Sequence, residues 1–287
     1  MDEASRTCAA LLRHLEATLE MAGVDEARRS AEWIAEEATG QRRALLYAYP
    51  DRPVDAETWA RAEAMVARRA AGEPLQYVVG HVDFRGLRLA VAPGVLIPRP
   101  ETEELVDHVL GALKGVSAPR VLDAGTGSGC LALALKAAHP DARVTALDVS
   151  PDALRIARAN AAALGLDVVF VQADLLSPGL PVEGPFDLIV SNPPYIPDAE
   201  ACTLDSVVLD HEPHVALFSG ADPLTFYHTL ARHGAAILRP GGLLWAEAHT
   251  DYAPAAAGCF EGPGWASAVI HHDTARRPRF VEARRAA

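Results

Sequence analysis

Short apolar runs typical of β-strands alternate with segments of helical periodicity from Pro98 to the end of the chain. Because strands that alternate with helices form parallel sheets, this pattern predicts an α/β fold with a mostly parallel sheet and helices on both faces. Ser150 and Pro151 mark the start of one helix as its N-cap and its first residue. The expected strands are 121–124, 144–147, 168–171, 186–190 and 242–247, with two more near Val269 and Phe280, and the expected helices are 101–113, 131–138 and 151–164.

The first 80 residues have a different pattern, which is typical of a small helical bundle. Leucines recur at helical spacing at Leu11, Leu12, Leu15 and Leu19. A second helix is predicted over 25–39, where Gly40 ends it, and a third over 55–71, with Asp55 as its N-cap and Gly72 after its end.

Residues 82–91 alternate between apolar and polar with a period of two on either side of Arg85-Gly86. Two such runs around a glycine predict a β-hairpin. We therefore divide the chain into an N-terminal helical domain over 1–80, a hairpin linker over 81–95 and an α/β domain over 96–287.

Composition narrows the classes of partner. The chain has 287 residues, 50% of them hydrophobic, and a formal net charge of −12, which disfavours a nucleic-acid partner because an acidic protein repels a phosphate backbone. The sequence has no apolar run of membrane-spanning length and begins without the features of a secretory signal, so we expect a cytoplasmic protein. The four cysteines lack metal-ligand spacing, and no metal site is expected.

The first candidate site is the loop Asp123-Ala-Gly-Thr-Gly-Ser-Gly129, between a predicted strand and a predicted helix. Glycines at this place let the backbone turn sharply and let a ligand approach it closely. Gly129 follows Gly127 by two positions, whereas the dinucleotide fingerprint needs its third glycine where this chain has Cys130. The loop therefore fits a nucleoside ligand better than a nicotinamide dinucleotide.

Two acids follow the next strands. Asp148 ends the second strand, where a carboxylate can accept hydrogen bonds from both ribose hydroxyls. Its alternative role is to favour the start of the following helix through the helix dipole, and the nearby glycine loop makes us prefer the ribose interpretation. Asp174 follows the third strand and is either a ligand contact at the same sheet edge or a surface turn residue.

The most specific motif is Asn192-Pro-Pro-Tyr195, directly after the strand 186–190. The two prolines fix the backbone and remove two N–H donors, so the carbonyls of Asn192 and Pro193 are left as acceptors. The Asn192 side chain adds another acceptor, and Tyr195 offers a flat ring. Such a site would present several acceptors to the NH2 group of a planar amide or base; the alternative is a rigid turn without a ligand.

Together these motifs resemble the class I methyltransferases that modify planar NH2 groups, which have a Rossmann-like fold. Within that class the chain is similar to the release factor glutamine methyltransferases. Two positions depart from the family: Ala248-His249 replaces a pair that usually ends in glycine, and a glycine expected around Arg276 is missing. The resemblance covers nearly everything after residue 70 and includes Gly72-Glu-Pro-Leu-Gln-Tyr77, Gly80, Phe84, 96–103, Glu212-Pro213, Ala216-Leu217 and Gly220-Ala-Asp222.

The resemblance implies S-adenosylmethionine as the cofactor and a peptide-chain release factor as the protein substrate, which the helical domain would contact. The methyl acceptor would be the amide nitrogen of the glutamine in a Gly-Gly-Gln loop. Asn192, Pro193 and Tyr195 would be catalytic and, with Pro194, would bind the substrate. The expected cofactor-binding residues are Gly125, Thr126, Gly127, Ser128 and Gly129 for the methionine end, Asp148 for the ribose, Asp174 and Leu175 for the adenine, and Asn192.

Three other functions remain open at this point. An adenine-N6 methyltransferase acting on DNA or RNA would use the same motif, but it needs a basic target-recognition region that the sequence lacks. A nicotinamide-dependent oxidoreductase would leave Asn192–Tyr195 without a role. A non-catalytic binding module would bind the cofactor without turnover. The segment with Arg99, Glu101 and Glu103 either covers the cofactor or simply begins a helix.

Overall fold

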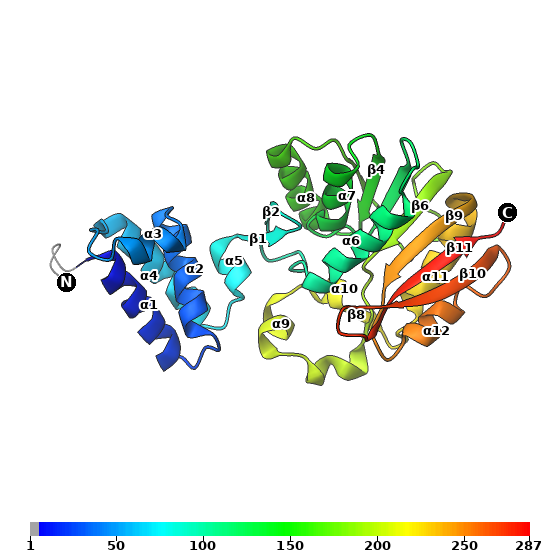
Figure 1. Cartoon of the computed structure of the whole chain (residues 1–287). Helices are drawn as coiled ribbons and strands as arrows, with labels where there is room; N and C mark the ends of the chain where they lie inside the picture. Colours follow the sequence, from blue (N-terminus) through cyan, green and yellow to red (C-terminus); the bar gives the residue numbers. More distant parts are fainter. Residues whose placement is uncertain (1–5) are drawn as a thin grey trace. The chain divides into compact units, whose positions relative to one another are not determined.

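The computed structural model describes residues 6–287, which form two compact units (Figure 1). The first contains the residues up to His81 together with Ser206–His211, and the second contains Val82–Asp205 and Glu212–Ala287. The helices of the first unit are α1 (Cys8–Met21), α2 (Ala27–Thr39), α3 (Arg43–Ala48), α4 (Ala56–Ala70), α5 (Leu75–Val79) and α9 (Ser206–His211).

The first unit is built around the leucines that the sequence placed on one helix face. Leu11, Leu15 and Leu19 of α1 are fully buried against α2 and α4. Asp55 caps α4 as predicted, because its carboxylate accepts a hydrogen bond from Thr58 N at 2.7 Å. The expected start of α2 at residue 25 is wrong by two residues, since the helix begins at Ala27 after a left-handed residue that makes no side-chain cap.

The predicted hairpin is confirmed as β1 (His81–Phe84) and β2 (Leu87–Ala90). Arg85 and Gly86 form its two-residue turn with φ of 47° and 76°. Two consecutive left-handed residues define the type I′ turn, whose twist matches that of the strands it joins.

The second unit contains a seven-stranded sheet in the order β10-β11-β9-β6-β3-β4-β5. The five strands from β9 to β5 are mutually parallel, and β11 and β10 are added antiparallel. These strands are β3 (Arg120–Ala124), β4 (Arg143–Asp148), β5 (Val169–Gln172), β6 (Phe186–Ser191), β9 (Leu238–Glu247), β10 (Trp265–His272) and β11 (Pro278–Arg285).

Helices cover both faces of this sheet, as predicted (Figure 1). Successive residues of β3 point to opposite sides: Val121 packs in the core formed with α6 and α7, and Leu122 in the core formed with α11 and α12. Burial of each such side chain stabilises the fold by about 1.5–3 kcal/mol. The remaining elements are α6 (Pro100–Ala112), α7 (Cys130–Ala138), α8 (Pro151–Leu164), β7 (Ile196–Pro197), η2 (Asp198–Thr203), α10 (His214–Leu217), β8 (Phe218–Gly220), α11 (Thr225–Ile237) and α12 (Ala253–Gly258).

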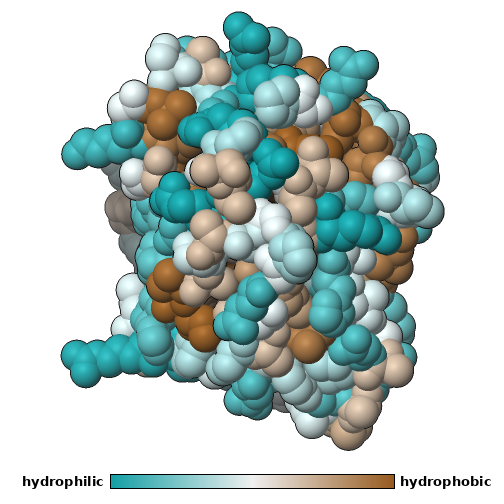
Figure 2. Space-filling model, turned by 90° about the vertical axis from the view of Figure 1, so that its right-hand side faces the viewer, coloured by the Kyte–Doolittle hydropathy of each residue, from teal (hydrophilic) through white to brown (hydrophobic). Residues whose placement is uncertain are grey.

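Hydrophilic and hydrophobic residues are interspersed on the face of the second unit that carries the C-terminal strands (Figure 2). Within residues 6–287, no helix has the length and apolar character needed to cross a bilayer. The parallel strands all end at one edge of the sheet. Asp148 ends β4 there, and the loops after β3, β5 and β6 hold the glycine loop, Asp174 and the Asn192 motif. This edge is where open α/β folds bind their ligands.

Candidate active site

A cavity of about 260 Å³ lies at the carboxyl edge of the parallel strands. Its walls come from the loops after β3, β4, β5 and β6, together with the segment 94–102 that leads into α6. The sequence-predicted residues that line it are Gly125, Thr126, Gly127, Ser128, Asp148, Asp174, Leu175, Asn192 and Pro194. Gly129, Pro193 and Tyr195 do not line the cavity, although each is next in sequence to a residue that lines it.

The three glycines of the loop after β3 are all left-handed, but they serve two purposes. A Cβ added at Gly125 or Gly127 would meet nothing within 4 Å, so the backbone here faces open space. A Cβ at Gly129 would lie 3.1 Å from Leu133 and 3.2 Å from Ala157. Gly129 therefore lets the loop pack closely against α7 and α8, and it leaves the cavity wall to the other two glycines.

A buried acid holds this loop from inside. Asp123 Oδ2 accepts hydrogen bonds from Thr126 Oγ1 at 2.6 Å and from Ala132 N at 3.1 Å. Its other oxygen, Oδ1, has no hydrogen-bond partner among the described residues. Burial raises the pKa of Asp123 to about 7. The sequence showed the acid in front of the glycines without giving it this role.

Asp148 fastens the same loop from the next strand. Its Oδ2 accepts a hydrogen bond from Gly127 N at 2.8 Å, and its Oδ1 accepts one from Ser150 N at 2.9 Å. Burial raises the pKa of Asp148 above its usual value. A carboxylate has about four acceptor positions, so two remain beyond these backbone contacts. Asp148 thus supports the helix start and lines the cavity at once.

The loop after β5 contributes an apolar wall and one exposed acid. Leu175 is buried at the cavity wall, and Asp174 is exposed beside it. Asp174 Oδ1 accepts a hydrogen bond from Leu176 N at 2.8 Å, which forms a local turn and leaves Oδ2 toward solvent or a ligand.

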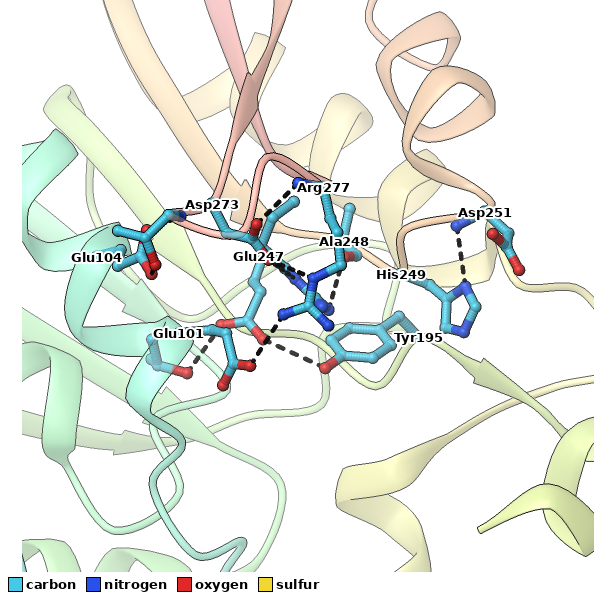
Figure 3. Close-up of polar contacts among 12 residues, drawn as sticks. Glu101, Glu104, Tyr195, Glu247, Ala248, His249, Asp251, Asp273 and Arg277 are labelled. Atoms are coloured by element: carbon cyan, nitrogen blue, oxygen red, sulfur yellow. Dashed lines mark hydrogen bonds and ion pairs between the residues drawn. The ribbon is translucent and has the colours of Figure 1, made fainter.

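The motif after β6 is held by a chain of side-chain hydrogen bonds. Asn192 Nδ2 donates to Thr102 Oγ1 at 3.1 Å, and Thr102 Oγ1 donates to Glu247 Oε2 at 2.8 Å. The Tyr195 hydroxyl donates to Glu247 Oε1 at 3.2 Å (Figure 3). Thr102 and Glu247 are buried, and burial raises the pKa of Glu247 and of Tyr195. Tyr195 therefore points its polar end at Glu247 and away from the cavity.

Two other ion pairs fix the segment that leads into α6. Arg99 Nη2 contacts Glu212 Oε1 at 2.6 Å, and Glu212 Oε2 accepts from Ile97 N at 3.0 Å. Farther along, Arg277 Nη2 contacts Glu101 Oε1 at 3.4 Å (Figure 3). Arg99 is thus held by a buried partner beside the cavity and is not oriented freely toward a ligand.

Comparison with known proteins covers both units. Residues 10–80 match the PrmC N-terminal domain, and residues 102–209 match the methyltransferase small domain. The release factor glutamine methyltransferase of Deinococcus radiodurans is 45% identical over 276 residues, which is 96% of this chain and 98% of that protein. The one from Streptomyces coelicolor is 41% identical over 92% of this chain and 93% of its own length.

The chain belongs to the release factor glutamine methyltransferase family. The resemblance predicted from the sequence is therefore confirmed, and the methyltransferase class and S-adenosylmethionine cofactor that it implied follow from it. A solved methyltransferase from Pyrococcus furiosus has a TM-score of 0.51 at 18% identity, covering 81% of this chain and 100% of that one, which shows the shared fold.

Two residues of the site, Thr102 and Glu247, were given no role in the sequence analysis. Thr102 lies in the segment 96–103 that carried part of the resemblance, and Glu247 ends the parallel strand β9. The end of a parallel strand is where a ligand-site residue is expected, so the position of Glu247 was a usable signal. Among residues 6–287, no group of histidine, cysteine and acidic side chains is arranged to hold a metal ion.

The two departures from the family have local explanations. Arg276, where a glycine was expected, has φ of 62° and so adopts the conformation that glycine usually supplies. Ala248 is buried, and its N–H donates to Arg279 O at 2.7 Å, which continues the pairing of β9 with β11. Neither residue lines the cavity.

Proposed function

We propose that this chain transfers a methyl group from S-adenosylmethionine to the side-chain amide nitrogen (N5) of the glutamine in the Gly-Gly-Gln motif of peptide-chain release factors. The observation that carries the proposal is one cavity, at the ligand edge of the sheet, lined by the glycine loop, Asp148 and Asn192 in a member of this family.

The cavity fits the chemistry of the cofactor. The backbone at Gly125 and Gly127 faces space that a Cβ would enter, and it would hold the methionine end. The unused acceptor positions of Asp148 suit the two hydroxyls of a ribose. Leu175, with Asp174 beside it, would hold the adenine. When bound, the cofactor supplies an electrophilic methyl group on a sulfonium.

The acceptors of the Asn192 motif suit a primary amide. Because Asn192 Nδ2 is engaged by Thr102, its Oδ1 is the atom left for a substrate NH2. The carbonyls of Asn192 and Pro193 add acceptors on a backbone that the prolines stiffen. A glutamine amide nitrogen is a weak nucleophile, so these residues would act by holding it in line with the methyl group and by stabilising the positive charge that develops on it.

No general base is needed at the amide in this scheme. The acids that line the cavity within the described chain are Asp148 and Asp174, and the proposal assigns both to the cofactor. Burial raises the pKa of Cys130, the remaining titratable residue of the lining, to about 12. The amide nitrogen becomes acidic only after it has gained the methyl group, and it would then lose its proton to water.

The helical unit is the proposed docking surface for the release factor. Its residues 10–80 match the PrmC N-terminal domain. On α3 and at its C-cap, Leu45, Tyr47 and Tyr49 are 42%, 47% and 53% exposed. Exposed tyrosines give rigid contact area with a polar tip, as in many protein interfaces. The reaction would take place in the cytoplasm, where translation occurs.

The direct test is mass spectrometry of a purified release factor after incubation with this enzyme and S-adenosylmethionine. We expect one added methyl group on the glutamine of the Gly-Gly-Gln motif. There are two matched controls: the Asn192→Ala enzyme with the unchanged release factor, and the unchanged enzyme with a release factor in which that glutamine is replaced by alanine. Neither reaction should give the methylated product. An unmodified release factor, with enzyme that binds the cofactor, would contradict the proposal.

A further inference from the structure

One buried carboxylate is linked to both ends of the substrate-binding motif, directly to Tyr195 and through Thr102 to Asn192. Glu247 Oε1 accepts from the Tyr195 hydroxyl at 3.2 Å (Figure 3), and Glu247 Oε2 accepts from Thr102 Oγ1 at 2.8 Å. Thr102 in turn accepts from Asn192 Nδ2 at 3.1 Å. The exposed fractions of Thr102 and Glu247 are 2% and 1%, so water does not compete for these contacts.

The direction of the hydrogen bonds in this chain follows from the single proton of the Thr102 hydroxyl. Glu247 accepts with both oxygens, so the proton of Thr102 is committed to it. Only the lone pairs of the hydroxyl are then available to Asn192, which must present its NH2 group to them. If the Asn192 amide were flipped, so that Oδ1 and Nδ2 exchanged places, Oδ1 would face the lone pairs of the Thr102 hydroxyl. Two acceptors would then oppose each other in a buried contact.

The orientation of the Asn192 amide matters because only one of its two ends can accept a hydrogen bond from the substrate. With Nδ2 held by Thr102, the Oδ1 end is free at the cavity wall. With Oδ1 held there instead, the free end would be an NH2 group opposing the NH2 of the substrate.

We propose that Glu247, acting through Thr102, is a positioning residue that orients the Asn192 amide with its oxygen toward the substrate NH2 group. This role rests on the proposed function, since it concerns the acceptor offered to that substrate. Burial raises the pKa of Glu247, and the hydrogen bond from Thr102 and the nearby charge of Arg279 oppose that rise. Glu247 also keeps Tyr195 turned away from the cavity.

The kinetic test compares Thr102→Val, which keeps the shape and removes the hydroxyl, with Thr102→Ser, which keeps the hydroxyl. We expect Thr102→Val and Glu247→Gln to lower kcat by about 10- to 100-fold, because misplacing a positioning contact by about 1 Å has an effect of this size. Thr102→Ser should recover most of the activity. The KM for S-adenosylmethionine should change much less than kcat in all three variants.

Thr274→Val is the matched control. Thr274, between β10 and β11, donates from Oγ1 to Glu104 Oε1 of α6 at 2.9 Å. This variant therefore removes another threonine–glutamate hydrogen bond that involves α6, and neither of its residues lines the cavity. It should leave kcat unchanged. Full activity of Thr102→Val, or no recovery in Thr102→Ser when both variants have the wild-type circular dichroism spectrum, would overturn the proposal.

A second readout does not depend on the substrate. In NMR spectra, the side-chain NH2 of Asn192 should exchange slowly with water in the wild-type protein and in Thr102→Ser, and rapidly in Thr102→Val. Rapid exchange in the wild-type protein would contradict the orientation. If the wild-type enzyme binds the cofactor but methylates no release factor, the proposed function fails, while this exchange measurement still decides the orientation of Asn192.

Discussion

The proposed cofactor half and the proposed substrate half of the cavity are stabilised by contacts of different range along the chain. In the cofactor half, Thr126 contacts Asp123 three positions away, and Gly127 contacts Asp148 21 positions away. In the substrate half, Asn192 contacts Thr102 across 90 positions, and Thr102 contacts a carboxylate 145 positions farther along. A local motif therefore builds most of the cofactor half, whereas the substrate half requires the whole sheet to be in place.

The largest expected effect is in the substrate half, at Asn192. Replacing it by alanine removes the acceptor that would stabilise charge on the substrate nitrogen, and we expect kcat to fall by about 100- to 1000-fold. Asn192 was also expected to contact the cofactor, so cofactor affinity, measured by titration calorimetry, should fall, but far less than kcat. An equal loss in kcat and in cofactor affinity would show that the two halves are not separate.

The converse change is Asp148→Asn in the cofactor half. The amide would place a donor against Gly127 N or Ser150 N, where the carboxylate accepts from both. We expect the Kd for S-adenosylmethionine to rise by about 10- to 100-fold, as for the loss of hydrogen bonds to a charged group. At saturating cofactor, kcat should largely recover.

Asp152→Asn is the control for that variant, since Asp152 lies on α8 with a largely exposed side chain and does not line the cavity. Its cofactor affinity should equal that of the wild type. A lower kcat in Asp148→Asn at unchanged cofactor affinity would be the opposite of what the geometry predicts.

Gly129→Ala tests whether the third glycine acts through packing. With φ of 86° and contacts of 3.1–3.2 Å for an added Cβ, we expect a loss of about 2 kcal/mol in the free energy of unfolding. Gly165→Ala is the matched variant, because Gly165 is also left-handed but has open space around it. Urea denaturation of both proteins should show the larger loss at Gly129, and equal losses would remove the packing argument.

The smallest effect is expected at Arg276, which does not line the cavity. A non-glycine residue in the left-handed region is strained, and glycine there should raise the free energy of unfolding by about 0.5–1 kcal/mol. The neighbouring variant Ala275→Gly should lower it instead, since Ala275 is not left-handed. If Arg276→Gly melts at a lower temperature than Ala275→Gly, the left-handed residue at this turn is not strained.

The range of the contacts also explains what the sequence could predict of the fold. Long periodic segments such as α8, and strands bounded by glycine or proline such as β6, were predicted within a few residues. The short helices α3 and α5 were missed because six and five residues are too few to show a helical period. The start of α2 was misplaced because its N-cap, Glu26, makes no side-chain hydrogen bond, while Asp25 beside it has the residue type that usually caps.

At the site, the sequence located the motifs but not what holds them. Asn192 was recognised because prolines follow it directly, whereas nothing next to Thr102 in the sequence pairs it with Glu247. Tyr195 was expected to offer its ring to the substrate and to act in catalysis, but its hydroxyl donates to Glu247 and it is not among the residues that line the cavity. That orientation depends on β9 lying beside β6, which only the folded sheet specifies.

The most direct test of the account offers both candidate acceptors in one reaction. A purified release factor and an oligonucleotide containing unpaired adenines would be incubated together with the enzyme and S-adenosylmethionine, and both would be analysed by tandem mass spectrometry. We predict a methyl group on the amide nitrogen of the Gly-Gly-Gln glutamine and none on the oligonucleotide. A methylated adenine with an unmodified release factor would contradict the account.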